Sequence, residues 1–230
     1  MVDNLSNGRF QIGIGRGTGG GQEFAMWGGN PEENNQRFAE TFKILMQGLT
    51  SDFLSFDGQF YQFQNLWMEL RPKQKPHPPF WYGGNPVHAG EYGGNFVCFG
   101  PIDNLPQMAA GYLESWENQR VENDPLLPHV AEPLYGARIQ VFLADTDREA
   151  DARARVAYRA YSANYTNPVP VGASPLPRPA GRRNIYAPGE ADFDTARQWG
   201  RLIVGSPHTV GEYVERYAAD STCNYFVASF

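Results

Sequence analysis

The sequence has few cysteines, no excess of basic residues and no long apolar run. Its 230 residues include only Cys98 and Cys223, too few for a disulfide framework or a four-ligand zinc site. The net charge of −6 argues against binding to a nucleic-acid backbone. No segment has the roughly 18–20 apolar residues of a membrane-spanning helix, and the first residues lack the pattern of a secretory leader. We therefore expect a cytoplasmic protein without nucleic-acid or membrane partners.

Glycine and proline, by contrast, are both above their usual shares, with 25 and 18 residues. Alternating apolar residues predict a strand at 10–14, and short apolar runs predict strands at 80–82, 95–99, 138–144 and 224–230. Helical spacing and capping signals predict helices at 31–48, at 147–163 and from 207. An aromatic-rich hairpin is expected over 51–70, and a long loop over the proline-rich stretch 166–191.

Strands that alternate with helices indicate an α/β protein with a parallel sheet. Glycines follow Ile14, Tyr82 and Phe99, where three of the predicted strands end. Parallel barrels place their ligand-binding loops at the carboxyl ends of the strands. The sequence therefore predicts that a phosphate-bearing cofactor docks at this edge.

Five segments resemble motifs of the bacterial luciferase-like, flavin-dependent monooxygenases, and they occur in the family's order. They are Leu5-Ser-Asn-Gly-Arg-Phe10, Gly13-Ile-Gly-Arg-Gly17, Pro31-Glu-Glu33 with Arg37-Phe38 and Glu40, Pro76-His-Pro-Pro-Phe-Trp-Tyr-Gly-Gly84, and Gly205-Ser-Pro-His-Thr-Val210. The resemblance spans nearly the whole chain. It implies a (β/α)8 TIM barrel with loop insertions, as a single domain over residues 1–230.

The resemblance also implies that only part of the barrel is present, from about strand 4 to strand 8. In the family, the segment matching 5–10 introduces the fourth strand, and a closing helix follows the strand matching 224–230. The first three strands and the C-terminal helix are then expected to be missing. We count five of eight strands, at Phe10, Phe80, Phe96, Ile139 and Tyr225. Open sheet edges favour pairing with another chain, so a homo-oligomer is a hypothesis.

The resemblance implies that Arg16 contacts the phosphate of flavin mononucleotide (FMN), because a guanidinium can pair with two phosphate oxygens at once. Gly15, Gly17 and Thr18 would let the cofactor approach the backbone and would offer amide donors. The alternative is an ordinary tight turn with a solvated arginine. The reactive cysteine that related luciferases carry at the position of Gly15 is absent.

A second part of the phosphate site is expected after the next family strand, at Gly83, Gly84 and Asn85. A helix that starts there could receive an anion, and His88 could add a donor one turn later. The alternative for His88 is a plain surface histidine.

No residue inherits the catalytic histidine of the related luciferases, which belongs to the missing part of the barrel, so the catalytic residues are unknown. No pair of cysteines or histidines has the spacing of a metal site. Phe24, Trp27 and Phe99 could line a substrate pocket, although aromatic residues in such stretches more often belong to the core.

The resemblance implies a monooxygenase that takes reduced FMN from a separate flavin reductase and oxygenates a small organic substrate with O2. The deazaflavin F420 is the alternative cofactor. Two further functions stay open, namely a non-catalytic flavin-binding protein and an inactive fragment of a luciferase-like enzyme.

Overall fold

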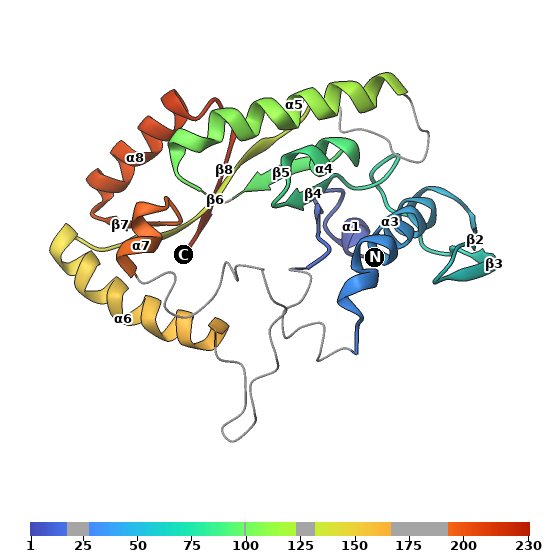
Figure 1. Ribbon diagram of the computed structural model, residues 1–230, viewed down its shortest axis with the longest axis horizontal. Coiled ribbons are helices and arrows are strands. Elements are labelled where there is room, and N and C mark those ends of the chain that lie inside the picture. The colour runs from blue at the N-terminus through green and yellow to red at the C-terminus, as the bar shows by residue number, and fades with distance from the viewer. Residues whose placement is uncertain (18–27, 99, 123–131, 167–192) are drawn as a thin grey trace. The chain divides into compact units, whose positions relative to one another are not determined.

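The computed structural model describes residues 1–17, 28–98, 100–122, 132–166 and 193–230 (Figure 1). The chain divides into two compact units. The first contains Met1–Phe96 and Tyr112–Pro133, and the second contains Val97–Gly111 and Leu134–Phe230. The single domain expected over residues 1–230 stays a prediction.

The first unit begins with the short helix α1 (Val2–Leu5) and a pair of parallel strands. Strand β1 (Ile12–Ile14) pairs with β4 (Phe80–Gly83), with Ile12 opposite Phe80 and Ile14 opposite Tyr82. Helix α4 (Pro86–Glu91) follows β4 and leads to β5 (Asn95–Cys98), whose residues fall on both sides of the boundary between the units. The predicted strands at 10–14, 80–82 and 95–99 are confirmed, with bounds shifted by one or two residues.

A helix and a hairpin separate β1 from β4 in sequence. The 3-10 turn η1 (Pro31–Glu33) runs into α3 (Asn34–Thr50), and the antiparallel strands β2 (Phe53–Asp57) and β3 (Gln62–Trp67) follow beside it (Figure 1). Glu40 of α3 fixes the hairpin turn, because its carboxylate accepts hydrogen bonds from the backbone N–H groups of Gln59, Phe60 and Tyr61. Both the helix and the hairpin are as predicted.

The apolar faces of β1 and β4 pack against α3. Phe42, Met46 and Phe80 are buried in this core, and Ile12 and Ile14 lie against them. Side chains alternate along a strand, so the residues between these positions face the opposite side of the sheet. That opposite face carries Gly13 and Trp81, which are partners in the β1–β4 register.

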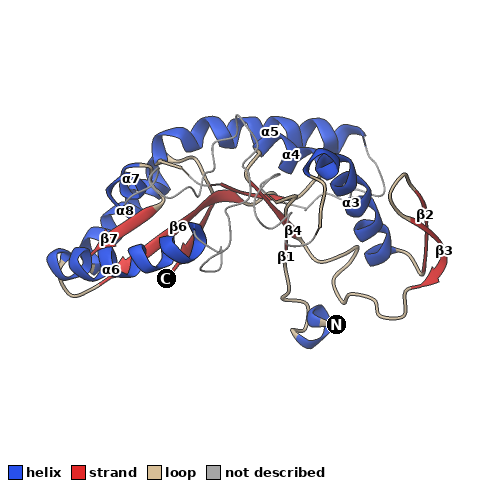
Figure 2. Cartoon of the chain, turned by 60° about the horizontal axis from the view of Figure 1, so that its bottom comes forward, coloured by secondary structure: helices blue, strands red, loops and turns tan. Residues whose placement is uncertain are grey.

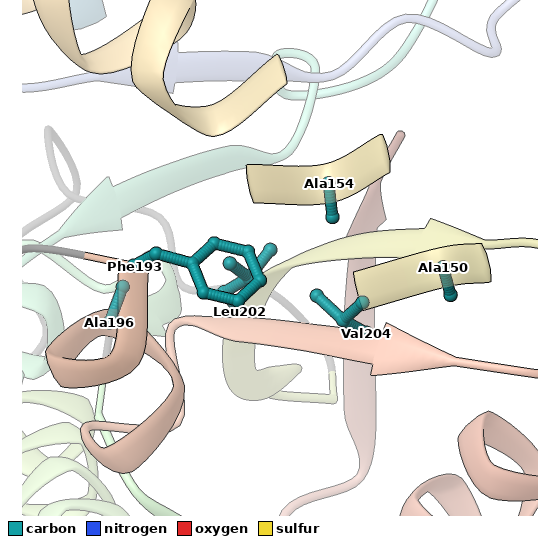
Figure 3. Close-up of a cluster of buried hydrophobic side chains, with 6 residues drawn as sticks. All are labelled: Ala150, Ala154, Phe193, Ala196, Leu202 and Val204. Carbon is teal, nitrogen blue, oxygen red and sulfur yellow. The ribbon is translucent and has the colours of Figure 1, made fainter. Parts of the chain in front are cut away.

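In the second unit, strand β6 (Tyr135–Leu143) pairs in parallel with β7 (Leu202–Gly205) and β8 (Tyr225–Ser229). Helices α6 (Asp147–Thr166), α7 (Phe193–Gln198) and α8 (Pro207–Asp220) pack against these strands (Figure 2). A cluster of six buried side chains joins α6, α7 and β7 (Figure 3): Ala150, Ala154, Phe193, Ala196, Leu202 and Val204.

The structure adds β7 to the strands counted from the sequence. Residues 202–205 form a four-residue strand that leads into α8, and they were not among the five strands predicted from the sequence. All four residues are buried and pair with Gln140–Leu143 of β6. Pairing with β6 therefore makes a strand of a segment that is too short to show a hydrophobic periodicity in the sequence.

Four more elements were not predicted, namely the helices α1 and α7, the 3-10 turn η2 (Ile102–Asn104) and the helix α5 (Leu105–Glu122). Pro106 and Gly111 weaken the helical signal of α5. Its buried residues Leu105, Ala109 and Tyr112 nevertheless recur at helical spacing, and this pattern could have revealed the helix.

The parallel pairing of β1 with β4 and of β6 with β7 and β8 agrees with the predicted α/β class, and the strands among the described residues do not close a barrel. Beyond Thr166, the predicted loop 166–191 lies outside the described residues. No helix in the described ranges is long and apolar enough to cross a membrane.

Candidate functional site

Two glycine-bearing turns meet at one edge of the sheet in the first unit. Because β1 and β4 run parallel with Ile14 opposite Tyr82, Gly15 and Gly83 are neighbours at the carboxyl ends of the two strands. Gly84 has a φ of +99°, a conformation that favours glycine. A β-carbon added at Gly15 or Gly84 would have no described neighbour within 4 Å. The backbone at this edge therefore leaves room for a ligand.

A cavity of about 250 Å³ opens beside the turn after β1. Its wall combines that turn with the start of α3 and the residues just before the helix. The lining residues are Gly15, Arg16, Gly29, Asn30, Asn34, Arg37, Phe38 and Thr41. Small-molecule sites usually measure about 300–1,000 Å³, so this space fits the phosphate end of a nucleotide-like cofactor better than a whole flavin.

The cavity wall contains two charged side chains, Arg16 and Arg37, and Arg16 is the one with a neutral partner. Its Nη1 donates a hydrogen bond of 2.6 Å to Oδ1 of Asn35 on α3. Among the described residues no carboxylate forms an ion pair with Arg16. Its positive charge is consequently available to an anion in the cavity.

Arg37 lines the same cavity but is already paired. Its Nε lies 2.6 Å from Oε2 of Glu33, and its guanidinium lies over the ring of Phe60, 4.2 Å from the centroid. Glu33 also accepts a hydrogen bond of 3.0 Å from Nδ2 of Asn30. The hydrogen bond from Arg37, followed by that from Asn30, lowers the pKa of Glu33, so this carboxylate stays ionised beside its arginine.

Aromatic side chains pack beneath the cavity. Phe38 contacts the rings of Tyr82 and Tyr92 at centroid distances of 5.8 and 5.6 Å. Burial raises the pKa of the Tyr82 phenol, although the nearby charge of Arg16 lowers it in part. The pKa of Tyr92 is raised for the same main reason. Both phenols are therefore neutral at physiological pH, and they leave the charge of Arg16 uncompensated.

The residues expected to form the second part of the phosphate site have local partners. Asn85 is the N-cap of α4, and its Oδ1 accepts a hydrogen bond of 3.2 Å from the backbone N–H of His88. The ring Nδ1 of His88 lies 2.7 Å from Oε2 of Glu91. Pro86 at the start of the helix has no N–H to offer. A ligand role for Asn85 and His88 stays a prediction.

Several predicted positions can be described only in part. Gly17 has a φ of +70°, as a glycine turn requires. Thr18 lies outside the described residues, and so do Phe24, Trp27 and Phe99.

Sequence reasoning missed part of the cavity wall. Asn30, Asn34, Arg37 and Thr41 line the cavity, and Asn35 holds Arg16. In the sequence, Arg37 stood out only as part of a family motif, and Asn30 only as a capping signal for the helix predicted at 31–48. The signal that could have found the asparagines is their cluster of three at positions 30, 34 and 35, directly before and at the start of a helix.

The cysteines lie in the second unit and are free. Cys98 is buried, its Sγ donates to the carbonyl oxygen of Gly136 at 3.5 Å, and burial raises its pKa to about 12. Within the described parts of the chain, no group of three or more histidine, cysteine, aspartate or glutamate side chains could hold a metal ion.

Two curated proteins are similar in sequence to parts of this chain. The F420-dependent glucose-6-phosphate dehydrogenase of Amycolatopsis mediterranei is 30% identical over 155 residues, which cover 65% of this chain and 41% of that protein. The FMNH2-dependent dimethylsulfone monooxygenase of Pseudomonas putida is 32% identical over 87 residues, which cover 36% and 24% of the two chains.

Among solved structures, the monooxygenase RslO1 of Streptomyces bottropensis superposes with a TM-score of 0.70 at 20% sequence identity. The match covers all of this chain and 63% of RslO1. The matched part of this chain thus covers less than two thirds of the length of each of these relatives. Its described strands and helices share the fold of the longer luciferase-like TIM-barrel enzymes.

The model of one protein family, described as luciferase-like monooxygenase, matches residues 1–222. That match covers nearly the whole chain and includes both glycine-bearing turns and the cavity. The chain belongs to the luciferase-like monooxygenase family.

Proposed function

We propose that this chain binds reduced FMN and serves an oxygenase that transfers one oxygen atom of O2 to a small organic substrate. The observation that carries the proposal is Arg16, an arginine without a described carboxylate partner, in a cavity at glycine-bearing strand ends. The FMNH2-dependent relative from Pseudomonas putida supports the choice of cofactor.

The residues at this edge suit the phosphate end of FMN. Arg16 would hold two phosphate oxygens, and the open backbone at Gly15 and Gly84 would let the cofactor approach. Gly17, Thr18, Gly83, Asn85 and His88 complete the proposed set.

Reduced flavin supplies the electrons for oxygen activation when it is bound. The chain's own contribution is to anchor the phosphate, orient the cofactor and keep water from its reactive part. Because the proposed ligand is FMN that is already reduced, a separate flavin reductase is the proposed partner. The proposal places the protein in the cytoplasm, as a single domain that can associate with a second copy.

F420 is the second candidate cofactor, and one observation favours it. The match to the F420-dependent dehydrogenase covers 65% of this chain, whereas the match to the FMNH2-dependent enzyme covers 36%. F420 would make the chain part of a dehydrogenase, in which hydride moves between substrate and deazaflavin without O2.

The test is a titration of the 230-residue chain with FMN, riboflavin and F420, followed by cofactor fluorescence. We expect FMN to bind more tightly than riboflavin, which lacks the phosphate. The Arg16→Ala variant should weaken FMN binding tenfold or more, about 1.4 kcal/mol, and should leave riboflavin binding nearly unchanged.

Arg9→Ala is the matched control, because Arg9 is an exposed arginine that precedes β1 and lies outside the cavity lining. It should bind FMN like the unmodified chain. Equal affinities for FMN and riboflavin would contradict the proposed phosphate site, and tighter binding of F420 would favour the dehydrogenase. FMN binding without substrate-dependent O2 consumption in the presence of a flavin reductase would favour a non-catalytic flavin-binding protein.

A further inference from the structure

We infer that Asn35 is a positioning residue that keeps Arg16 selective for a doubly charged phosphate monoester. The inference rests on the proposed function and adds to it the residue that sets the charge of the site. Asn35 does not line the cavity, and it acts through its hydrogen bond to Arg16.

The contact between the two side chains is short and joins separate segments. Nη1 of Arg16 lies 2.6 Å from Oδ1 of Asn35, 19 residues later in the chain. Asn35 is the second residue of α3, a helix held to the sheet by Phe42 and Met46. The contact therefore restrains one edge of the guanidinium from a rigid element and leaves the other N–H groups for a ligand.

Two carboxylates near the cavity, those of Glu33 and Glu91, have other partners. Glu33 is paired with Arg37 at 2.6 Å. Glu91 acts on the pKa of Tyr82 together with Arg16, but its carboxylate lies 2.7 Å from the ring of His88. The described acceptor for Arg16 is thus a neutral amide, although two carboxylates lie near the same site.

The neutrality of this acceptor decides what Arg16 can bind. An amide oxygen orients the guanidinium and leaves its full positive charge, so a phosphate gains the attraction. An aspartate at position 35 would have nearly the same shape and would form an ion pair with Arg16. Its negative charge would also repel the phosphate. The two effects have the same sign, and neither acts on an uncharged ligand.

The isosteric variant Asn35→Asp tests this difference. An acidic residue in the first turn of a helix is favourable, and position 35 is exposed, so we expect the variant to fold normally. Its dissociation constant for FMN should rise at least fivefold, and its dissociation constant for riboflavin should change less than twofold. If Asn35 had a merely structural role, the variant would change the dissociation constants of FMN and riboflavin by the same factor.

Gln36→Glu is the matched control, because it adds the same charge at the next exposed position of α3, which does not line the cavity. It should leave both dissociation constants within twofold. Asn35→Ala, which removes the acceptor without adding charge, should weaken FMN binding about two- to fivefold, the usual effect of one lost hydrogen bond.

The outcomes separate this inference from the proposed function. If the unmodified chain prefers FMN to riboflavin and Asn35→Asp keeps that preference, the role of Asn35 is wrong and the phosphate site stands. If the unmodified chain shows no preference for FMN, the proposed function itself is wrong, and the inference with it. A Gln36→Glu effect as large as that of Asn35→Asp would also overturn the inference, because charge anywhere on this helix turn would then suffice.

Discussion

The carboxyl ends of the parallel strands carry different groups in the two units. In the second unit, Asp147 accepts hydrogen bonds from the backbone N–H of Ser206 at 2.7 Å and from Oγ1 of Thr209 at 2.8 Å. A carboxylate of the chain thus occupies the start of α8, where an anion could otherwise bind. In the first unit, the strand ends carry glycines and an arginine with a neutral partner.

The two units also differ in the partners of some of their arginines. Arg155 of α6 pairs with Asp151 and with Asp194, and Arg197 pairs with the same Asp151. These charges satisfy one another and fasten α7 to α6. Arg16 has no such carboxylate among the described residues. The paired arginines Arg155 and Arg197 thus stabilise the second unit itself, whereas the charge of Arg16 in the first unit stays available to a ligand.

The largest expected effect is on the alkylation rate of the Cys98 thiol, which tests whether the core of the second unit excludes a small reagent. Its pKa of about 12 leaves very little thiolate at pH 8, and its side chain is buried. We expect alkylation of Cys98 in the native Cys223→Ser variant to be more than a thousandfold slower than that of a free cysteine, whose pKa is about 8.5. Timed labelling with iodoacetamide and mass spectrometry would measure the rate.

The urea-unfolded variant serves as the control and should react at the rate of a free thiol. Rapid labelling of the native protein would show that the second unit opens readily, and the contrast between the units would then be lost.

Two strand glycines provide the next comparison. A β-carbon at Gly136 of β6 would lie 1.7 Å from the carbonyl oxygen of Tyr225, whereas one at Gly13 of β1 would meet no described atom within 4 Å. We expect Gly136→Ala to lower the free energy of unfolding by about 1–3 kcal/mol or more, because backbone must move. Gly13→Ala should change it by less than about 0.5 kcal/mol. Urea denaturation followed by circular dichroism would measure both, and equal losses would contradict the open space beside Gly13 on β1.

The smallest expected effect is a pH dependence at Asp147. The hydrogen bond from the backbone of Ser206, followed by that from Thr209, lowers the pKa of this carboxyl. A carboxyl with a lowered folded-state pKa stabilises the fold above its unfolded pKa of about 3.9, and the contribution disappears as pH falls through the folded value. Asp147→Asn should therefore unfold at a lower temperature than the unmodified chain above about pH 5, and the gap should close below about pH 4.

Asp145→Asn is the control, because Asp145 makes no hydrogen bond or ion pair with a described residue. A gap between Asp147→Asn and the unmodified chain that is constant with pH would mean that the lost charge is not the cause.

Local patterns in the sequence were sufficient for much of the fold. Alternating apolar residues located β1, short apolar runs located β4, β5, β6 and β8, and the capping signals located α3, α6 and α8. They failed for β7, which has four residues, and for α5, whose helical signal is interrupted by Pro106 and Gly111. Periodicity needs several turns or pleats to show, whereas packing can stabilise a run that is shorter or less regular.

The sequence by itself determined the family motifs, the glycine turns after the strands, and Arg16 as the candidate anion-binding residue. Only the tertiary structure decided that Asn35 is the partner of Arg16, that Arg37 shares its cavity, and that Asp147 closes the start of α8. Signals such as caps and apolar periods act between residues a few positions apart, so the sequence displays them directly. The partner of a charged side chain depends on which distant segments the core brings together, and this choice sets whether the charge remains available to a ligand.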